Sequence, residues 1–305
     1  MNKLVENIKT LEIDTIKNLK NSKANNTLRA YKSDFKDFSL FCSKNGFKDL
    51  PSDPKILALY ITQLSKTSKF STLKRRLASI SIIHKMKGFY IDTKHPLIIE
   101  NLMGIKRKIG SNQKSKKPIL ISTLKDIINI IDQSKSNFLR KLRDKAIILI
   151  GFSGGFRRSE LVNIWLEDTE FVSEGVKIFI KKSKTDQSGE GMTKAIPYFI
   201  NENYCPVKAL KNWINQGNIK EGKIFDISDK SVALIIKKYI GLAGLNPNIY
   251  SGHSLRSGFA TSTAESGAEE RNIMAMTGHK TTQMVRRYIK EANLFKNNAL
   301  NKLKI

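Results

Sequence analysis

The chain has 305 residues, a length typical of two domains, and its 40% of hydrophobic residues is enough for ordinary buried cores. No apolar run approaches the roughly 20 residues that cross a bilayer, and the charged N-terminal segment argues against a secretory signal peptide. Only two cysteines, Cys42 and Cys205, are present, so a disulfide framework is not expected. The composition therefore favours a cytoplasmic protein with no membrane association.

Charge is the strongest compositional signal. Lys and Arg total 54 against 27 acidic residues, which gives a formal net charge of +27. Such a surplus favours a polyanionic partner, because each phosphate contacted by a cation releases condensed counterions. A membrane surface is the weaker alternative, since no long predicted helix combines a basic face with one rich in Trp and Phe. A Lys-rich composition inherited from an AT-rich genome is the other explanation; the charge favours nucleic acid over it.

The first hundred residues are predicted to be helical. Apolar side chains recur at every third or fourth position between 28 and 41, which indicates one face of a helix. The segment Ser52-Asp53-Pro54 supplies a cap and a first-turn proline for a second helix. Further helices are predicted from about Ser71 to Gly88 and from Pro96 to Ile109. His84 and His95 have no partners of matching chemistry nearby in the sequence, so we expect surface or turn positions for both.

Two basic segments are predicted to contact a nucleic acid. Lys74, Arg75 and Arg76 lie together on the third predicted helix, as either a solvated face or a phosphate-binding one, and the net charge favours the second. Residues 111–118 are polar, bounded by Gly and Pro, and include Lys116 and Lys117, the composition of an interdomain linker. We therefore divide the chain into a helical domain at 1–110, this linker, a second domain at 119–293 and a tail at 294–305.

The second domain is predicted to be mostly helical with one small sheet. Helices are expected at 122–132 and 137–152, and again near 206, 228, 253, 268 and 281. Between 170 and 199 the pattern changes. The residues Val176, Ile178 and Ile180 alternate with those at 177, 179 and 181, two of which are lysines, as in a strand. The run 195–200 is a second extended segment, which predicts an antiparallel hairpin. The fold class expected is mainly α with a small antiparallel β-sheet in the second domain.

Five short segments of the second domain carry the candidate chemistry. Each is weak evidence alone, because an Arg at a helix start usually forms an ion pair and a Tyr on an amphipathic helix is usually half-buried core. Their order and spacing are more specific: Arg157 precedes Glu160 by three residues, and His279 precedes Tyr288 by nine. The segments are GGFRRSEL at 154–161, KSKT at 182–185, GHSLR at 252–256, TGHK at 277–280 and VRRYI at 285–289.

As an ordered set, these segments resemble the tyrosine recombinase family, which includes phage integrases, Cre and the Xer proteins. That family carries an Arg in a Gly-hydrophobic-Arg-x-x-Glu-Leu turn, a Lys on a β-hairpin, a His-x-x-Arg, a Gly-His and a later Tyr. The match covers nearly the whole second domain. Arg158 and Thr277 depart from the usual pattern, which has an apolar residue and Leu there, and Lys182 competes with Lys184 for the hairpin position. The resemblance implies the catalytic set Arg157, Lys184, His253, Arg256, His279 and Tyr288, with Glu160 in support.

The chemistry of these residue types suits attack on a phosphodiester. Attack adds negative charge to the non-bridging oxygens, and the planar guanidinium groups of Arg157 and Arg256 match those oxygens. Tyr288 is the predicted nucleophile, and it needs nearby cations and a base because a free phenol has a pKa near 10. His253 is the candidate base, since an imidazole exchanges protons near neutral pH.

The remaining roles come from the resemblance. It implies that Lys184 protonates the departing 5′ oxygen and that His279 forms a hydrogen bond with the phosphate. Glu160 either orients a cation and braces the local fold or is an ordinary carboxylate at a helix start. We expect neither a metal nor a cofactor, because the arginines neutralise charge and a phosphotyrosyl ester conserves the energy of the broken bond.

The function predicted is that of a site-specific recombinase that forms a 3′-phosphotyrosine intermediate and a Holliday junction, in integration, excision or dimer resolution. The resemblance implies a prokaryotic, nucleoid-associated enzyme acting as a homotetramer on double-stranded DNA with a specific target site, with or without a related recombinase or accessory protein. The tail docks either on a neighbouring protomer or on its own domain. The alternatives are a type IB topoisomerase, a DNA-binding protein that does not cut, and a generic binder of nucleic acid or membrane surfaces.

Overall fold

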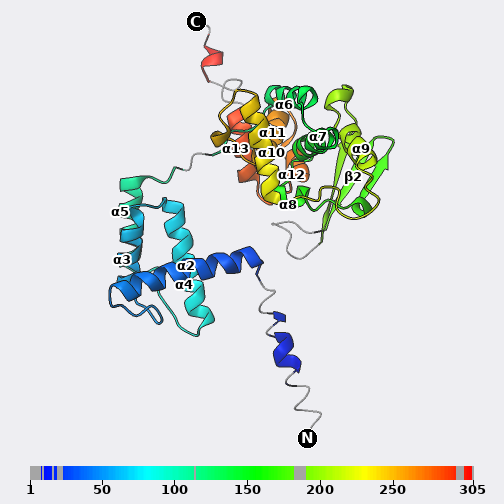
Figure 1. Cartoon of the computed structure of the whole chain (residues 1–305). Coiled ribbons are helices and arrows are strands. Elements are labelled where there is room, and N and C mark those ends of the chain that lie inside the picture. The colour runs from blue at the N-terminus through cyan, green and yellow to red at the C-terminus, as the bar shows by residue number, and fades with distance from the viewer. Residues whose placement is uncertain are drawn as a thin grey trace. The chain divides into compact units, whose positions relative to one another are not determined.

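The computed structural model describes residues 8, 10–15, 17–18, 23–112, 115–181, 190–292 and 299–303. The chain divides into two compact units, Met1–Lys114 and Ser115–Ile305, and Figure 1 labels their elements. The division falls within the segment 111–118 that the sequence marks as a linker. Over the described ranges, no helix is both long enough and apolar enough to cross a membrane.

The described part of the first unit is built from packed helices. Asp53 caps the second of them, because the backbone N–H of Ile56 donates to its carboxylate at 3.0 Å, and Pro54 fills the first position. Phe38 and Leu57 are fully buried where the apolar faces meet. The predicted helices are confirmed, and their bounds are α2 (Asn25–Lys44), α3 (Pro54–Ser65), α4 (Phe70–Met86) and α5 (Pro96–Ile109).

The prediction for His84 was wrong. This residue is fully buried on α4, where its Nδ1 lies 2.9 Å from the carbonyl oxygen of Ile80. The backbone N–H of Ser52 donates to its Nε2 at 3.2 Å, so the ring proton lies on Nδ1 and is donated to that carbonyl. The two backbone partners satisfy both ring nitrogens, which makes burial of the ring possible. His95 lies at a turn as predicted, and it caps α5 by accepting from the backbone of Leu97 at 3.2 Å.

The second unit is mostly helical around one central helix. The run 146–150 of α7 is fully buried, and α6, α9 and α11 pack on this core (Figure 1). The fold class predicted from the sequence is confirmed. The helices are α6 (Ile121–Gln133), α7 (Phe138–Ser153), α8 (Arg158–Leu161), α9 (Pro206–Gln216), α10 (Asp229–Leu242), α11 (Ser254–Glu265), α12 (Glu270–Thr277) and α13 (Thr282–Ala292).

The sheet of this unit has three antiparallel strands in the order β1 (Thr169–Val172), β2 (Gly175–Ile180) and β3 (Met192–Pro197). The alternation seen in the sequence is confirmed, since the β2 side chains at 176, 178 and 180 are buried. The last strand begins three residues earlier than the extended run 195–200, and β1 was not singled out. This earlier start makes Lys194 the partner of Ile178 in the β2–β3 register.

Candidate active site

The first candidate residue follows the end of α7. The backbone N–H of Phe156 donates to the carbonyl of Gly151, and the backbone N–H of Gly155 donates to the carbonyl of Phe152. This pair of hydrogen bonds is typical of a helix that ends at a residue in the left-handed conformation. Gly155 has φ +54°, and a Cβ there would come within 3.1 Å of Phe259 and Thr277. Glycine is therefore required, and the chain leaves this turn with Arg157 directly before α8.

Glu160 fixes the position of Arg157. The Arg157 backbone N–H donates to Oε2 of Glu160 at 2.9 Å, and its Nη1 donates to Oε1 at 2.5 Å. The Arg157 side chain also donates from Nη2 to the carbonyl of Gly278 at 3.3 Å. Because Glu160 is only 4% exposed, it holds the guanidinium from the protein interior, and the Arg157 side chain keeps 16% of its surface exposed.

Arg256 on α11 is a fully buried cation. Its Nη1 donates to the carbonyl of Gly155 at 2.8 Å, whereas Nε and Nη2 have no hydrogen-bond partner among the described residues. Burial, together with the positive charge of Arg157, lowers the pKa of Arg256 to about 10, so the side chain stays charged at neutral pH. Buried donors without partners are costly, and an anion bound here would satisfy both of them.

His253 and Tyr288 form the candidate base and nucleophile. His253 lies directly before α11, and its Nε2 is 3.3 Å from the hydroxyl oxygen of Tyr288 on α13. The phenol ring packs on the small cluster that contains Ala260 and Val285, which fixes the helix face carrying the hydroxyl. Although His253 is exposed, partial desolvation and then the charges of Arg256 and the other nearby arginines lower its pKa. The ring is thus neutral at pH 7 and able to accept a proton.

His279 is held by Thr277, two residues earlier in the sequence. Gly278 ends α12 with φ +62°, a left-handed cap that turns the chain so that His279 is 6% exposed. The hydroxyl of Thr277 donates its only proton to the carbonyl of Ile273 at 2.6 Å, so it accepts from Nδ1 of His279 at 2.8 Å. Burial and the charges of nearby arginines lower the pKa of His279 to about 4. The neutral ring therefore carries its proton on Nδ1.

These groups surround a hollow of about 470 Å³ in the second unit. The structure thus brings together the predicted residues of the segments 154–161, 252–256 and 277–280, and the 3.3 Å contact between Nε2 of His253 and the Tyr288 hydroxyl places Tyr288 beside them. Lys184 lies outside the described residues. The lining residues are Arg157, Arg158, Ser159, Asp229, His253, Arg256, His279 and Met284.

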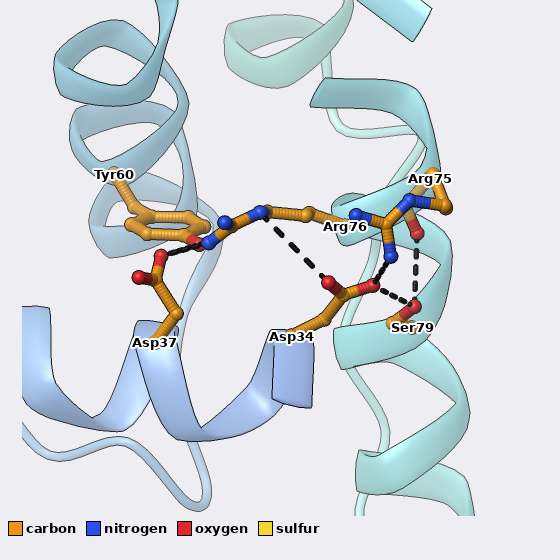
Figure 2. Close-up of polar contacts among 6 residues, drawn as sticks. All are labelled: Asp34, Asp37, Tyr60, Arg75, Arg76 and Ser79. Carbon is orange, nitrogen blue, oxygen red and sulfur yellow. Dashed lines mark hydrogen bonds and ion pairs between the residues drawn. The ribbon is translucent and has the colours of Figure 1, made fainter. Parts of the chain in front are cut away.

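The predicted DNA-contacting residues of the first unit differ in how freely they face solvent. Lys74 is exposed and the Arg75 side chain is 50% exposed, whereas that of Arg76 is only 19% exposed. Both arginines form ion pairs with α2, Arg75 with Asp34 and Arg76 with Asp37 (Figure 2). Arg76 therefore serves mainly to join helices. The side chains of Lys74 and Arg75 are exposed enough to contact a ligand.

Figure 2 shows that these ion pairs join α2 and α4 of the first unit, and that Tyr60 adds α3 through hydrogen bonds. Asp34 on α2 is 3% exposed and also accepts from Ser79 on α4 at 2.7 Å. Tyr60 on α3 donates to Asp37 at 2.6 Å and accepts from Nη1 of Arg76 at 2.7 Å. The network keeps Arg75 at a fixed place on α4.

The two lysines of the linker are fastened to the second unit. Lys116 donates from Nζ to the carbonyl of Asn248, and the backbone N–H of Lys117 donates to that of Ile249 at 2.8 Å. Both side chains are exposed. Their positive charges therefore lie at the surface, next to the segment that leads to His253.

Sequence reasoning missed Lys194. This lysine is 1% exposed, and its Nζ donates to the carbonyls of Gly154 at 2.6 Å and Met276 at 2.5 Å. One signal could have found it: Lys194 and Ile196 share a strand face, so a strand that buries Ile196 also buries the lysine. The extended run predicted from 195 onward began one residue too late to include it.

Comparison with known proteins places the chain in a family. A model of the phage integrase family matches residues 121–294. An integrase/recombinase xerD homolog from Selenomonas ruminantium is 43% identical, covering 99% of this chain and 92% of that protein. Tyrosine recombinase XerC from Syntrophus aciditrophicus is 25% identical and covers 91% of each chain. The chain belongs to the phage integrase family, that is, the tyrosine recombinases.

Solved structures share the fold. The XerH site-specific recombinase bound to a palindromic difH substrate, in a post-cleavage complex, gives a TM-score of 0.67 at 16% identity, covering 88% of this chain and 80% of that one. A lambda integrase dimer bound to a COC′ core site gives 0.58 at 18% identity, covering 96% and 98%. At such low identity these likenesses concern the architecture alone.

Proposed function

We propose that this protein cleaves and rejoins double-stranded DNA at a specific target site through a covalent bond between Tyr288 and a 3′ phosphate. As a tyrosine recombinase it is a site-specific DNA strand transferase. The observation that carries the residue assignment is the 3.3 Å contact between Nε2 of His253 and the Tyr288 hydroxyl, beside the buried and partly unsatisfied guanidinium of Arg256.

The proposed cleavage step uses Tyr288, three residues that line the hollow, and Lys184. Tyr288 attacks phosphorus and loses its proton to Nε2 of His253, while Arg157 and Arg256 hold the non-bridging oxygens as their charge grows. The bond from phosphorus to the 5′ oxygen breaks, and Lys184 gives that oxygen a proton. A 5′ hydroxyl of another strand later reverses these steps, which restores the DNA backbone and frees Tyr288.

His279 has a specific proton requirement in this scheme. Its Nδ1–H is already donated to Thr277, so a hydrogen bond from His279 to a phosphate oxygen needs a second proton on Nε2. Burial, and then the positive charges of the arginines, disfavour this proton in the free protein. A bound phosphate has the opposite effect, because its negative charge stabilises the imidazolium. We propose that His279 takes up a proton when the scissile phosphate binds.

The two units are proposed to share the DNA. Residues 1–110 act as a core-type DNA-binding domain that contacts phosphates through Lys74 and Arg75, and residues 111–118 link it to the catalytic unit. Contacts of this kind position the enzyme without reading sequence. Four protomers exchange strands between two duplexes through a Holliday junction, with or without a related recombinase or accessory protein, on the DNA of a prokaryotic nucleoid.

The tail at 294–305 is proposed to dock on a neighbouring protomer. Leu300 and Leu303 are 66% and 56% exposed, which gives this segment apolar surface that another protomer can contact. The second unit carries a mainly apolar hollow of about 540 Å³, lined by residues that include Phe152, Ile196 and Phe259. Such a surface fits an apolar segment. A chain truncated after Asn293 should bind DNA as a monomer without assembling or recombining, and unchanged assembly would exclude an intermolecular role.

Covalent capture tests the proposal. The protein is mixed with fragmented DNA of its source organism, quenched with SDS and examined for protein–DNA adducts, with Tyr288→Phe alongside. Adducts that vanish in the variant support the mechanism, and sequencing the trapped ends identifies the target site. Occupation of a site without any adduct would instead favour a DNA-binding protein that does not cut.

A second assay separates recombination from topoisomerase activity. A supercoiled plasmid with two copies of the captured site should yield recombinant products that depend on both copies. A plasmid without the site should stay supercoiled. Relaxation of that control plasmid, with no recombinant product from the first, would favour the type IB topoisomerase alternative.

A further inference from the structure

Lys194 joins the two segments that present the phosphate-binding residues. One of its acceptors, the carbonyl of Gly154, belongs to the turn that leads into Arg157. The other, the carbonyl of Met276, belongs to the last turn of α12, which leads into His279. A single ammonium on β3 thus holds both segments at hydrogen-bond distance.

The surroundings of Lys194 are unusual for a purely structural residue. Its Nζ lies 4.4 Å from the ring centre of Phe156, and the two groups that accept its hydrogen bonds are uncharged carbonyls. Burying an ammonium costs much more free energy than burying an apolar side chain of similar length. A methionine would fill the same space without that cost. The cation is therefore better explained by the geometry it imposes than by packing.

Other cations fasten the same two segments. Arg256 donates to the carbonyl of Gly155, and Arg157 donates to the carbonyl of Gly278. Lys194 acts one residue earlier on the first segment and two residues earlier on the second. The turn bearing Arg157 and the end of α12 are thereby each held by two cationic side chains.

Charged groups on the neighbouring elements set the proton affinity of Lys194. Burial and the charges of Arg256 and Arg157 outweigh the opposing charge of Glu160 and lower the pKa of Lys194 to about 7. The charge of Lys194 also lowers the pKa of His279. A phosphate bound at the arginines favours the ammonium form, which strengthens both carbonyl hydrogen bonds.

We infer that Lys194 is a positioning residue: it holds Arg157 and His279 at the places where both can contact the same phosphate. It does not line the hollow and is 1% exposed, so it does not touch the substrate. The inference rests on the proposed cleavage by Tyr288. It also separates the two lysines of the hairpin region: Lys184 protonates the leaving group, and Lys194 holds the residues that bind the phosphate.

Two substrates distinguish these roles. The first is a nicked duplex with the captured target sequence, and the second replaces the bridging 5′ oxygen at the cleavage position with sulfur. A thiolate leaves without a proton, so the second substrate needs no general acid. Covalent complex formation is measured at saturating DNA for the wild type, Lys194→Met and Lys184→Met. Lys145→Met is the matched control, a lysine of α7 paired with Asp132.

Lys194→Met should bind the site nearly as well as the wild type and cleave both substrates about 100-fold more slowly, the typical cost of misplaced catalytic groups. Lys184→Met should lose cleavage of the unmodified duplex but cleave the sulfur-containing substrate normally. Lys145→Met should cleave both substrates at the wild-type rate. Normal cleavage of both substrates by Lys194→Met overturns the inference, and so does its rescue by sulfur, which would make Lys194 the acid.

Folding is checked by thermal melting. If Lys194→Met does not fold, the same comparison on Lys194→Gln decides, because the shorter amide cannot reach both carbonyls. A wild-type protein that forms no adduct on either substrate would refute the proposed function itself. Wild-type adducts with an unaffected Lys194 variant would refute the positioning role alone.

Discussion

Replacement of Arg256 by lysine should slow DNA cleavage strongly although the charge is kept. The Arg256 side chain is fully buried, and its Nη1 donates a hydrogen bond to the carbonyl of Gly155. Its Nε and Nη2 have no partner among the described residues and are the donors that we assign to the phosphate. A lysine has one nitrogen, which cannot satisfy the Gly155 carbonyl and also grip two phosphate oxygens in a plane.

The magnitude follows from the donors that are lost. One donor aimed at charge that develops in the transition state contributes about 3–4 kcal/mol, or roughly 100- to 1000-fold in rate. Arg256→Lys loses at least one such donor, so we expect the cleavage rate at saturating DNA to fall by about 100- to 1000-fold. Binding should weaken much less, because the remaining ammonium still attracts the phosphate.

The assay is single-turnover formation of the SDS-resistant complex on a nicked duplex carrying the captured site. Arg158→Lys is the matched control: Arg158 lines the same hollow, but its guanidinium pairs with Asp229 at 3.6 Å and is 41% exposed. The control should cleave at close to the wild-type rate. Cleavage by Arg256→Lys within tenfold of the wild type, with normal melting, would refute the argument that its free donors bind the phosphate.

Four further changes test the surroundings of the site and the ion pairs of the first unit. Thr277→Val leaves the buried Nδ1–H of His279 without an acceptor and should lower the free energy of unfolding by about 1–3 kcal/mol in urea titrations, with recovery in Thr277→Ser. Because folding lowers the pKa of His279 to about 4 from an ordinary 6.5, the unfolded chain binds more protons between these values. The free energy of unfolding should thus fall by roughly 3 kcal/mol as the pH is lowered from 6.5 to 4. The decrease should be smaller in His279→Gln. A Cβ on Gly258 would lie 1.9 Å from the carbonyl oxygen of Ile119, so Gly258→Ala should cost about 1–3 kcal/mol; unchanged melting would disprove the close contact. Asp34→Asn should lower the stability of the first unit by about 1–3 kcal/mol and weaken DNA binding, and a gain in binding would contradict our account of Arg75.

Local sequence signals accounted for most of the fold. Asp53 and Pro54 predicted the start of α3, and the apolar alternation at 176–180 predicted β2, because caps and periodicity act over a few residues. The three-residue spacing from Arg157 to Glu160 likewise sets their ion pair within one helical turn. Such features depend little on the rest of the chain.

Features that arise from tertiary contacts could not be predicted in this way. His84 is buried because a backbone N–H 32 residues earlier satisfies its ring. Lys194 finds its acceptors 40 and 82 residues away, and Thr277 fixes the His279 proton only once α12 ends at the left-handed Gly278. In each case the contact depends on a backbone group or on a turn whose position the sequence does not reveal.

Identification of the residue that carries the DNA tests the central claim most directly. The trapped adduct is digested with nuclease and protease, and the peptides are sequenced by mass spectrometry. Our account predicts a nucleotide linked through its 3′ phosphate to Tyr288 and to no other residue. A nucleotide on a different side chain, or on a 5′ phosphate, would contradict it.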